Sequence, residues 1–75
     1  MQSVHTFAYR AFLKRLVAAR VDAGLTQVQV AERLRIPQSQ VSRMETGERR
    51  VDVIELDTLA RVYRKPLSFF VPKRR

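Results

Sequence analysis

The middle of the chain, residues 25–47, holds two short amphipathic segments separated by a tight break. Apolar residues recur in both segments at the spacing of one helix face, at Val30, Ala31 and Leu34 in the first and at Val41 and Met44 in the second. Each segment therefore has one side to bury, and the residues between the two stripes suffice only for a turn. The sequence predicts two helices packed across that turn, which is a helix-turn-helix.

Capping signals place the ends of these two helices. Thr26 followed three residues later by Gln29 matches the capping box, in which a hydroxyl and an amide satisfy each other's free backbone donors. The first helix is therefore expected over 27–34. Pro37 is tolerated in a first helical turn, because the amide it lacks would have no helical acceptor, so the second helix is expected over about 38–46.

Further helices are expected on both sides of this pair. Apolar residues at helical spacing predict a helix over about 7–23, followed by Gly24 as its left-handed end. Asp52 with Glu55 is a second capping signal. The inner face of the helix that it starts is expected to consist of Val53, Leu56, Leu59, Ala60 and Tyr63.

Lys65-Pro66 interrupts the helical pattern, and residues 67–70 fit one last short turn whose aromatics either close the base of the core or face a second subunit. The chain is thus predicted to be one all-α domain of five helices over 1–75. Its core is expected over about 7–71, followed by a basic tail at 72–75. Seventy-five residues bury only a small core, so marginal stability or help from a partner subunit is expected.

Composition narrows the classes of function. A formal charge of +8 favours a polyanionic partner. With no Cys and one His we expect no disulfide, no metal site and no cofactor. No apolar run approaches the ~20 residues that cross a bilayer, and no motif pairs a nucleophile with a base, so neither a membrane protein nor an enzyme is expected. The basic amphipathic N-terminal segment also fits a transit peptide or a membrane-surface helix.

Several residues of the central segment match a known pattern. The match begins with Leu25-Thr26-Gln27 and continues at Ala31, Gln38, Val41, Ser42, Glu45 and Gly47. With its flanks, this pattern resembles the phage-repressor and Cro-like helix-turn-helix family, often called the xenobiotic-response-element family, over about residues 12–70. The resemblance implies a compact lambda-repressor-like fold. It also implies a sequence-specific double-stranded DNA-binding regulator of transcription, with the helix over 38–46 in the major groove.

The polar side of that helix carries groups suited to base edges. Amides pair with adenine, guanidinium groups with guanine, and hydroxyl groups with either. The residues expected to read bases are Gln38, Ser39 and Arg43, and the resemblance gives Gln38 the family's base-contacting role. The residues expected at the DNA backbone or at the edge of the groove are Gln27, Gln40, Ser42, Arg49 and Arg50, with Glu48 as a neighbour that partly neutralises the two arginines.

Two further expectations concern the frame of the motif. The resemblance suggests that Glu45 turns inward and forms a structural ion pair with Arg20, which fixes the angle of the recognition helix. Similar proteins usually have Gly where this chain has Arg35, so the tight turn predicts a left-handed backbone at Arg35.

The expected partners are double-stranded DNA and a second copy of the chain, bound as a two-fold dimer to a palindromic operator in the cytoplasm, at the nucleoid. An alternative is the antitoxin of a toxin-antitoxin pair, a protein-interaction module that can also bind DNA. Its contacts to a protein partner would be Leu67, Phe69, Phe70 and Val71.

Overall fold

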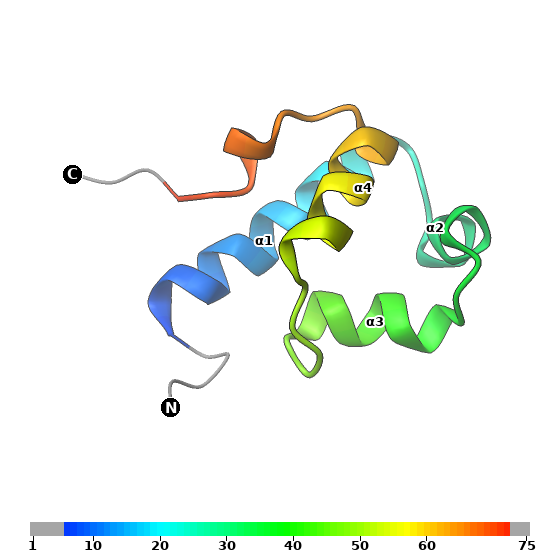
Figure 1. Ribbon diagram of the computed structural model, residues 1–75, viewed down its shortest axis with the longest axis horizontal. Helices are drawn as coiled ribbons and strands as arrows, with labels where there is room; N and C mark the ends of the chain where they lie inside the picture. The colour runs from blue at the N-terminus through cyan, green and yellow to red at the C-terminus, as the bar shows by residue number, and fades with distance from the viewer. Residues whose placement is uncertain (1–5, 73–75) are drawn as a thin grey trace.

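The computed structural model describes residues 6–72, which form four α-helices and one short 3-10 turn (Figure 1). These elements are α1 (Phe7–Asp22), α2 (Gln27–Leu34), α3 (Gln38–Thr46), α4 (Val53–Tyr63) and η1 (Leu67–Phe69). In Figure 1, α3 lies along one edge of the domain, with α2 beside its first turn and the loop to α4 at its other end. Nothing in the described part of the chain is a strand, so the all-α expectation holds over 6–72.

The expected count of five helices is wrong, because the last element is a single 3-10 turn. Pro66 precedes it, and the bonds from Phe69 N to Pro66 O (3.0 Å) and from Phe70 N to Leu67 O (3.1 Å) span three residues. A proline without a backbone N–H and a segment this short leave no room to propagate an α-helix.

The capping signals define two helix starts as expected. Thr26 Oγ1 accepts from Gln29 N at 3.1 Å, and Gln29 Oε1 accepts from Thr26 N at 2.9 Å. Asp52 and Glu55 exchange the corresponding bonds at 2.7 and 3.2 Å. Such pairs depend only on residues three positions apart, which is why the local sequence is enough to place them.

Two arginines adopt left-handed backbone conformations at helix ends. Arg35 has φ 59° and ψ 45°, which confirms the left-handed turn between α2 and α3. Arg64, which ends α4, has the same φ of 59°, and no sequence pattern predicted this conformation. Gly47 ends α3 at φ 89°, where the absence of a Cβ removes the usual penalty.

The core lies where α1 meets the other helices. Its residues are Leu16, Ala19, Val30, Ala31, Val41, Met44, Leu59, Ala60, Tyr63 and Phe70. Val53 was expected among them but is 68% exposed, because it belongs to the first turn of α4, beyond the edge of the core. Helical spacing shows which side of a helix is buried, but it does not show at which point along the helix axis the core ends.

Phe70 closes the base of the core, and its exposure is 0%. It was also expected among the residues that contact a protein partner, and in this fold it cannot do so. The turn that carries it is held on α1, since Arg15 Nη1 donates to the Phe69 carbonyl at 2.9 Å. The Lys65 ammonium lies 4.7 Å from the centre of the Phe69 ring and 3.2 Å from Asp22.

Of the expected contact set, Leu67 and Val71 remain exposed, and Phe69 is half-buried. Residues 73–75 of the basic tail lie outside the described part of the chain. None of the helices within 6–72 combines the length and the apolar character needed to cross a membrane.

Candidate nucleic-acid interface

The outer face of α3 presents the side chains expected to read bases. Gln38, Ser39 and Arg43 are exposed, and Gln40 and Ser42 are half-buried beside them. The opposite face inserts Val41 and Met44 into the core. Pro37 gives the first turn no side-chain cap, so the start of the helix keeps free backbone donors.

A line of hydrogen bonds joins the surface of α3 to the interior. Gln38 Nε2 donates to Gln27 Oε1 at 2.8 Å, and Gln27 Nε2 donates to Glu45 Oε1 at 2.8 Å. The structure therefore brings together two residues that the sequence analysis gave separate roles, one at bases and one at phosphate. Neither contact is visible in the sequence, because 11 and 18 positions separate the partners.

The inner end of this line is a two-bond ion pair. Arg20 Nε and Nη2 donate to the two oxygens of Glu45 at 2.7 and 3.2 Å, and Arg20 Nη1 donates to the Leu25 carbonyl at 2.9 Å. The side chains are 15% and 6% exposed, so water reaches the pair poorly. The hydrogen bond from Arg20 to Glu45 raises the pKa of Arg20 above its ordinary value despite the opposing effect of burial.

Tyr63 of α4 lies close enough to respond to the same charges. Burial raises the pKa of Tyr63 to about 12, and the Glu45 carboxylate adds to this rise while Arg20 opposes it. The ion pair thus lies near α4, and it ties the C-terminal half of α3 to α1.

The loop from α3 to α4 is held from two sides. The Arg49 guanidinium binds both carboxylate oxygens of Glu55, through Nη1 at 3.1 Å and through Nη2. This hydrogen bonding lowers the pKa of Glu55. On the other side, the Arg50 guanidinium lies 4.7 Å from the centre of the Tyr9 ring, and the Tyr9 hydroxyl accepts from Val51 N at 3.2 Å.

The pairing of Arg49 differs from the sequence-based expectation. Glu48 was expected to offset Arg49 and Arg50. Its carboxylate lies 3.9 Å from Arg43 Nε, and both groups are well exposed. Arg49 instead pairs with a residue of the α4 capping box. Sequence reasoning missed Tyr9 and Glu55 as holders of the loop, because only the fold brings Tyr9 to it and Glu55 was already explained as a cap.

This surface offers hydrogen-bond donors, hydrogen-bond acceptors and positive charge. Within residues 6–72, no group of three or more His, Cys, Asp or Glu side chains is placed to hold a metal ion. The arrangement suits binding of an extended anionic ligand that also carries hydrogen-bonding edges.

A family model described as helix-turn-helix matches residues 16–70, which include all of α2, α3, α4 and η1. A search of curated proteins finds no match.

Proposed function

The chain belongs to the Cro/C1-type helix-turn-helix family of DNA-binding transcription regulators, also called the XRE family, and from that premise we propose that it reads specific double-stranded sequences with α3 in the major groove. The observation that carries this proposal is the exposed polar face of α3, at Gln38, Ser39 and Arg43, on a helix held by a shielded ion pair. A face of this kind matches the hydrogen-bonding pattern of base edges.

The proposed roles follow from the contacts of each side chain. Gln38, Ser39 and Arg43 read bases, and the 3.9 Å pair of Arg43 with Glu48 is exposed and weak enough for DNA to displace it. Gln27 supports Gln38 and reaches phosphate from the start of α2, where free backbone amides attract anions. Backbone or groove-edge contacts are assigned to Gln40, Ser42, Arg49 and Arg50.

We propose further that two copies bind a palindromic operator about the DNA dyad, in the cytoplasm at the nucleoid. Both recognition helices must enter the same side of the duplex, so the half-site centres should lie about 34 Å apart. If each copy neutralises about four phosphates, the logarithm of the affinity should fall with the logarithm of salt concentration at a slope of roughly −7.

The test is selection of bound duplexes from a random pool, followed by affinity measurements on the selected and on random sequences. Gln38→Ala or Arg43→Ala should cost about 1 to 3 kcal/mol on the selected site and relax base preference there. Gln27→Ala removes a proposed phosphate contact and the acceptor that holds Gln38, so it should weaken random duplexes as well as the selected one, and the selected one at least as much.

Arg61→Ala is the matched control for Arg43→Ala, because it removes an exposed arginine of α4 that is likewise paired with one carboxylate, Asp57. This variant should leave base preference unchanged. Equal losses on both DNA pools for Gln38→Ala would remove it from the base-reading set. A flat salt response, or a pool without a consensus, would contradict sequence-specific DNA binding.

A further inference from the structure

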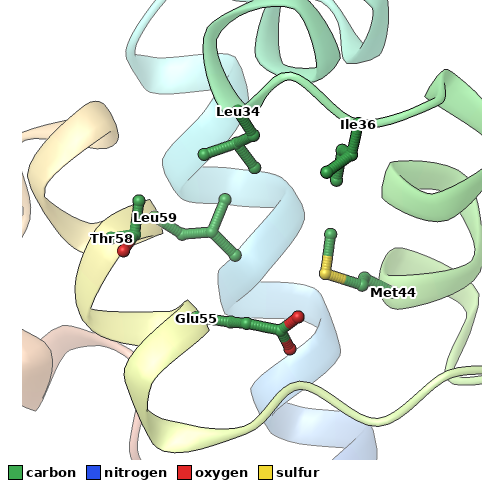
Figure 2. A pocket seen from close by; sticks show the side chains of 6 residues that line it. All are labelled: Leu34, Ile36, Met44, Glu55, Thr58 and Leu59. Atoms are coloured by element: carbon green, nitrogen blue, oxygen red, sulfur yellow. The ribbon is translucent and has the colours of Figure 1, made fainter.

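Two hollows open beside α4, and they differ in chemistry. The hollow beside the first half of the helix has a volume of about 160 Å³ and is mostly apolar, and Figure 2 shows the side chains that line it, which are Leu34, Ile36, Met44, Glu55, Thr58 and Leu59. The charged residue among them, Glu55, is already bound by Arg49. The hollow at the other end of α4 is larger, about 470 Å³, and it is mostly polar. Its lining comes from the ends of α1, α2 and α4 and from the residues that follow α1 and α4.

Three basic side chains line this second hollow, and one acidic side chain offsets them only in part. The basic residues are Arg33, Arg64 and Lys65, and the acidic residue is Asp22. Asp22 is bound to Lys65 at 3.2 Å. Within residues 6–72, neither Arg33 nor Arg64 has a side-chain hydrogen bond or an ion pair. Three positive charges less one negative charge leave an excess of two positive charges around the recess.

The helix ends do not account for this excess. The last carbonyl groups of a helix attract cations when they lack a hydrogen-bond partner. At the end of α1 the Arg20 carbonyl accepts from Leu25 N at 3.2 Å, and at the end of α4 the Ala60 carbonyl accepts from Lys65 N at 2.9 Å. A corresponding bond closes α2, from Ile36 N to the Ala31 carbonyl at 3.1 Å. The guanidinium groups of Arg33 and Arg64 are therefore left to water or to a ligand.

We propose that this hollow binds a small molecule that carries a phosphate group, with the phosphate oxygens held by Arg33 and Arg64. A guanidinium group presents paired N–H donors that match phosphate oxygens, and a phosphate group with two negative charges balances the excess. The volume of the hollow falls within the range of about 300 to 1,000 Å³ that small-molecule sites occupy. Half-buried Leu25 and Val62 and the buried Tyr63 give the rest of such a molecule an apolar wall.

The site is separate from the base-reading face. The end of α4 lies on the side of the domain away from α3 (Figure 1). A ligand held by Arg33 and Arg64 would connect α2 to the end of α4, and it would stabilise the folded domain by binding to it alone. This inference goes beyond the proposed function and does not depend on it. Phosphate groups can also come from a second DNA duplex, so the experiment has to distinguish the two sources.

The experiment is a titration of the isotope-labelled full chain with inorganic pyrophosphate at physiological salt, followed by the amide chemical shifts. Saturable shifts should be concentrated at residues 22–25, at 33 and at 62–65. Arg33→Gln and Arg64→Gln should each raise the dissociation constant of pyrophosphate at least tenfold. Arg61→Gln is the matched control, because it removes an exposed arginine one helical turn before Arg64, and it should leave the dissociation constant unchanged. Urea denaturation without pyrophosphate checks that each variant is folded.

Three results of this titration would overturn the proposal. They are shifts that do not saturate, shifts concentrated at 27–43 instead of at the hollow, and equal losses of affinity in Arg61→Gln and Arg64→Gln. The last result would mean that pyrophosphate responds only to the net charge of the chain, which each variant lowers equally.

A second titration, with a duplex of random sequence, separates the two sources of phosphate. Shifts at 62–65 that appear with the duplex and not with pyrophosphate would make the hollow a DNA contact and would overturn the small-molecule site. Saturable pyrophosphate binding at the hollow by a chain without sequence preference on DNA would support the inference and contradict the proposed function. Sequence-specific DNA binding by a chain that does not bind pyrophosphate would do the reverse.

Discussion

The two ends of α3 are held in different ways. At its C-terminal end, Glu45 is tied to Arg20 inside the domain, and the loop that follows is held by Glu55 through Arg49 and by Tyr9. At its N-terminal end, Pro37 provides no side-chain cap, and the polar contact of Gln38 is with another amide, Gln27.

This difference shows how a small domain can hold a helix in a fixed orientation and still keep adaptable side chains at one surface. A shielded ion pair fixes the direction of a helix, while exposed amides and hydroxyls remain available to a ligand. The fixed end sets the angle at which the open end is presented. Changes at the fixed end should therefore act on stability first, and changes at the open end on binding.

The largest effect is expected at the ion pair. Arg20→Met or Glu45→Gln leaves the other member of the pair shielded from water without its charged partner. Each change should lower the free energy of unfolding by about 3 kcal/mol, and the double variant should lose less than the sum of the two single losses. Urea denaturation of the four proteins measures this. Arg61→Met with Asp57→Asn is the exposed control, where each change should cost about 0.5 kcal/mol or less. Strictly additive losses at Arg20 and Glu45 would show that the pair does not hold the helix.

A smaller effect is expected at Tyr9. Tyr9→Phe removes the acceptor of the Val51 N–H and keeps the ring beneath Arg50, so it should cost about 1 kcal/mol. Tyr9→Leu also removes the cation–π contact and should cost about 0.5 to 1 kcal/mol more. Hydrogen exchange at the Val51 amide is the direct measurement, and protection there should fall in both variants. If it persists in Tyr9→Phe, the hydroxyl does not hold the loop.

The smallest effect on stability is expected at the two left-handed arginines. Gly removes a backbone penalty of about 1 kcal/mol but adds freedom to the unfolded chain, so Arg35→Gly and Arg64→Gly should each leave stability unchanged or slightly raised. Thermal melts compare the two. The two variants should differ in their affinity for DNA. Arg35→Gly removes a positive charge beside the start of α3 and should weaken binding to all sequences alike, whereas Arg64→Gly should not weaken it. Clear destabilisation by either change would contradict the assigned strain.

Local signals in the sequence were sufficient for much of the fold. The starts of α2 and α4 follow from capping pairs three residues apart. The left-handed turn at Arg35 follows from the tight break between two apolar stripes together with the glycine that similar proteins have there. Three errors have one origin. The position of Val53 relative to the core, the assignment of Phe70 to a protein contact and the partner of Arg49 all depend on how separate elements meet.

The candidate site shows the same limit. The identity of its exposed polar residues can be inferred from helical periodicity together with family resemblance. The contacts among these residues cannot be inferred in this way, because the hydrogen bond from Gln38 to Gln27 requires α2 and α3 to be packed first. Tyr9 carried no sequence signal for its role, since it lies 42 positions from the amide that it binds.

The hydrogen bonds that run from Glu45 through Gln27 to Gln38 determine which way each amide group is turned. A carboxylate can only accept hydrogen bonds, so Gln27 must turn its NH2 group inward and its carbonyl oxygen toward Gln38. Gln38 must in turn donate, which leaves its own carbonyl oxygen and its second N–H for an adenine edge. The acceptor-only oxygens of one inward-facing carboxylate therefore decide which atoms of Gln38 the surface offers to a base before any DNA arrives.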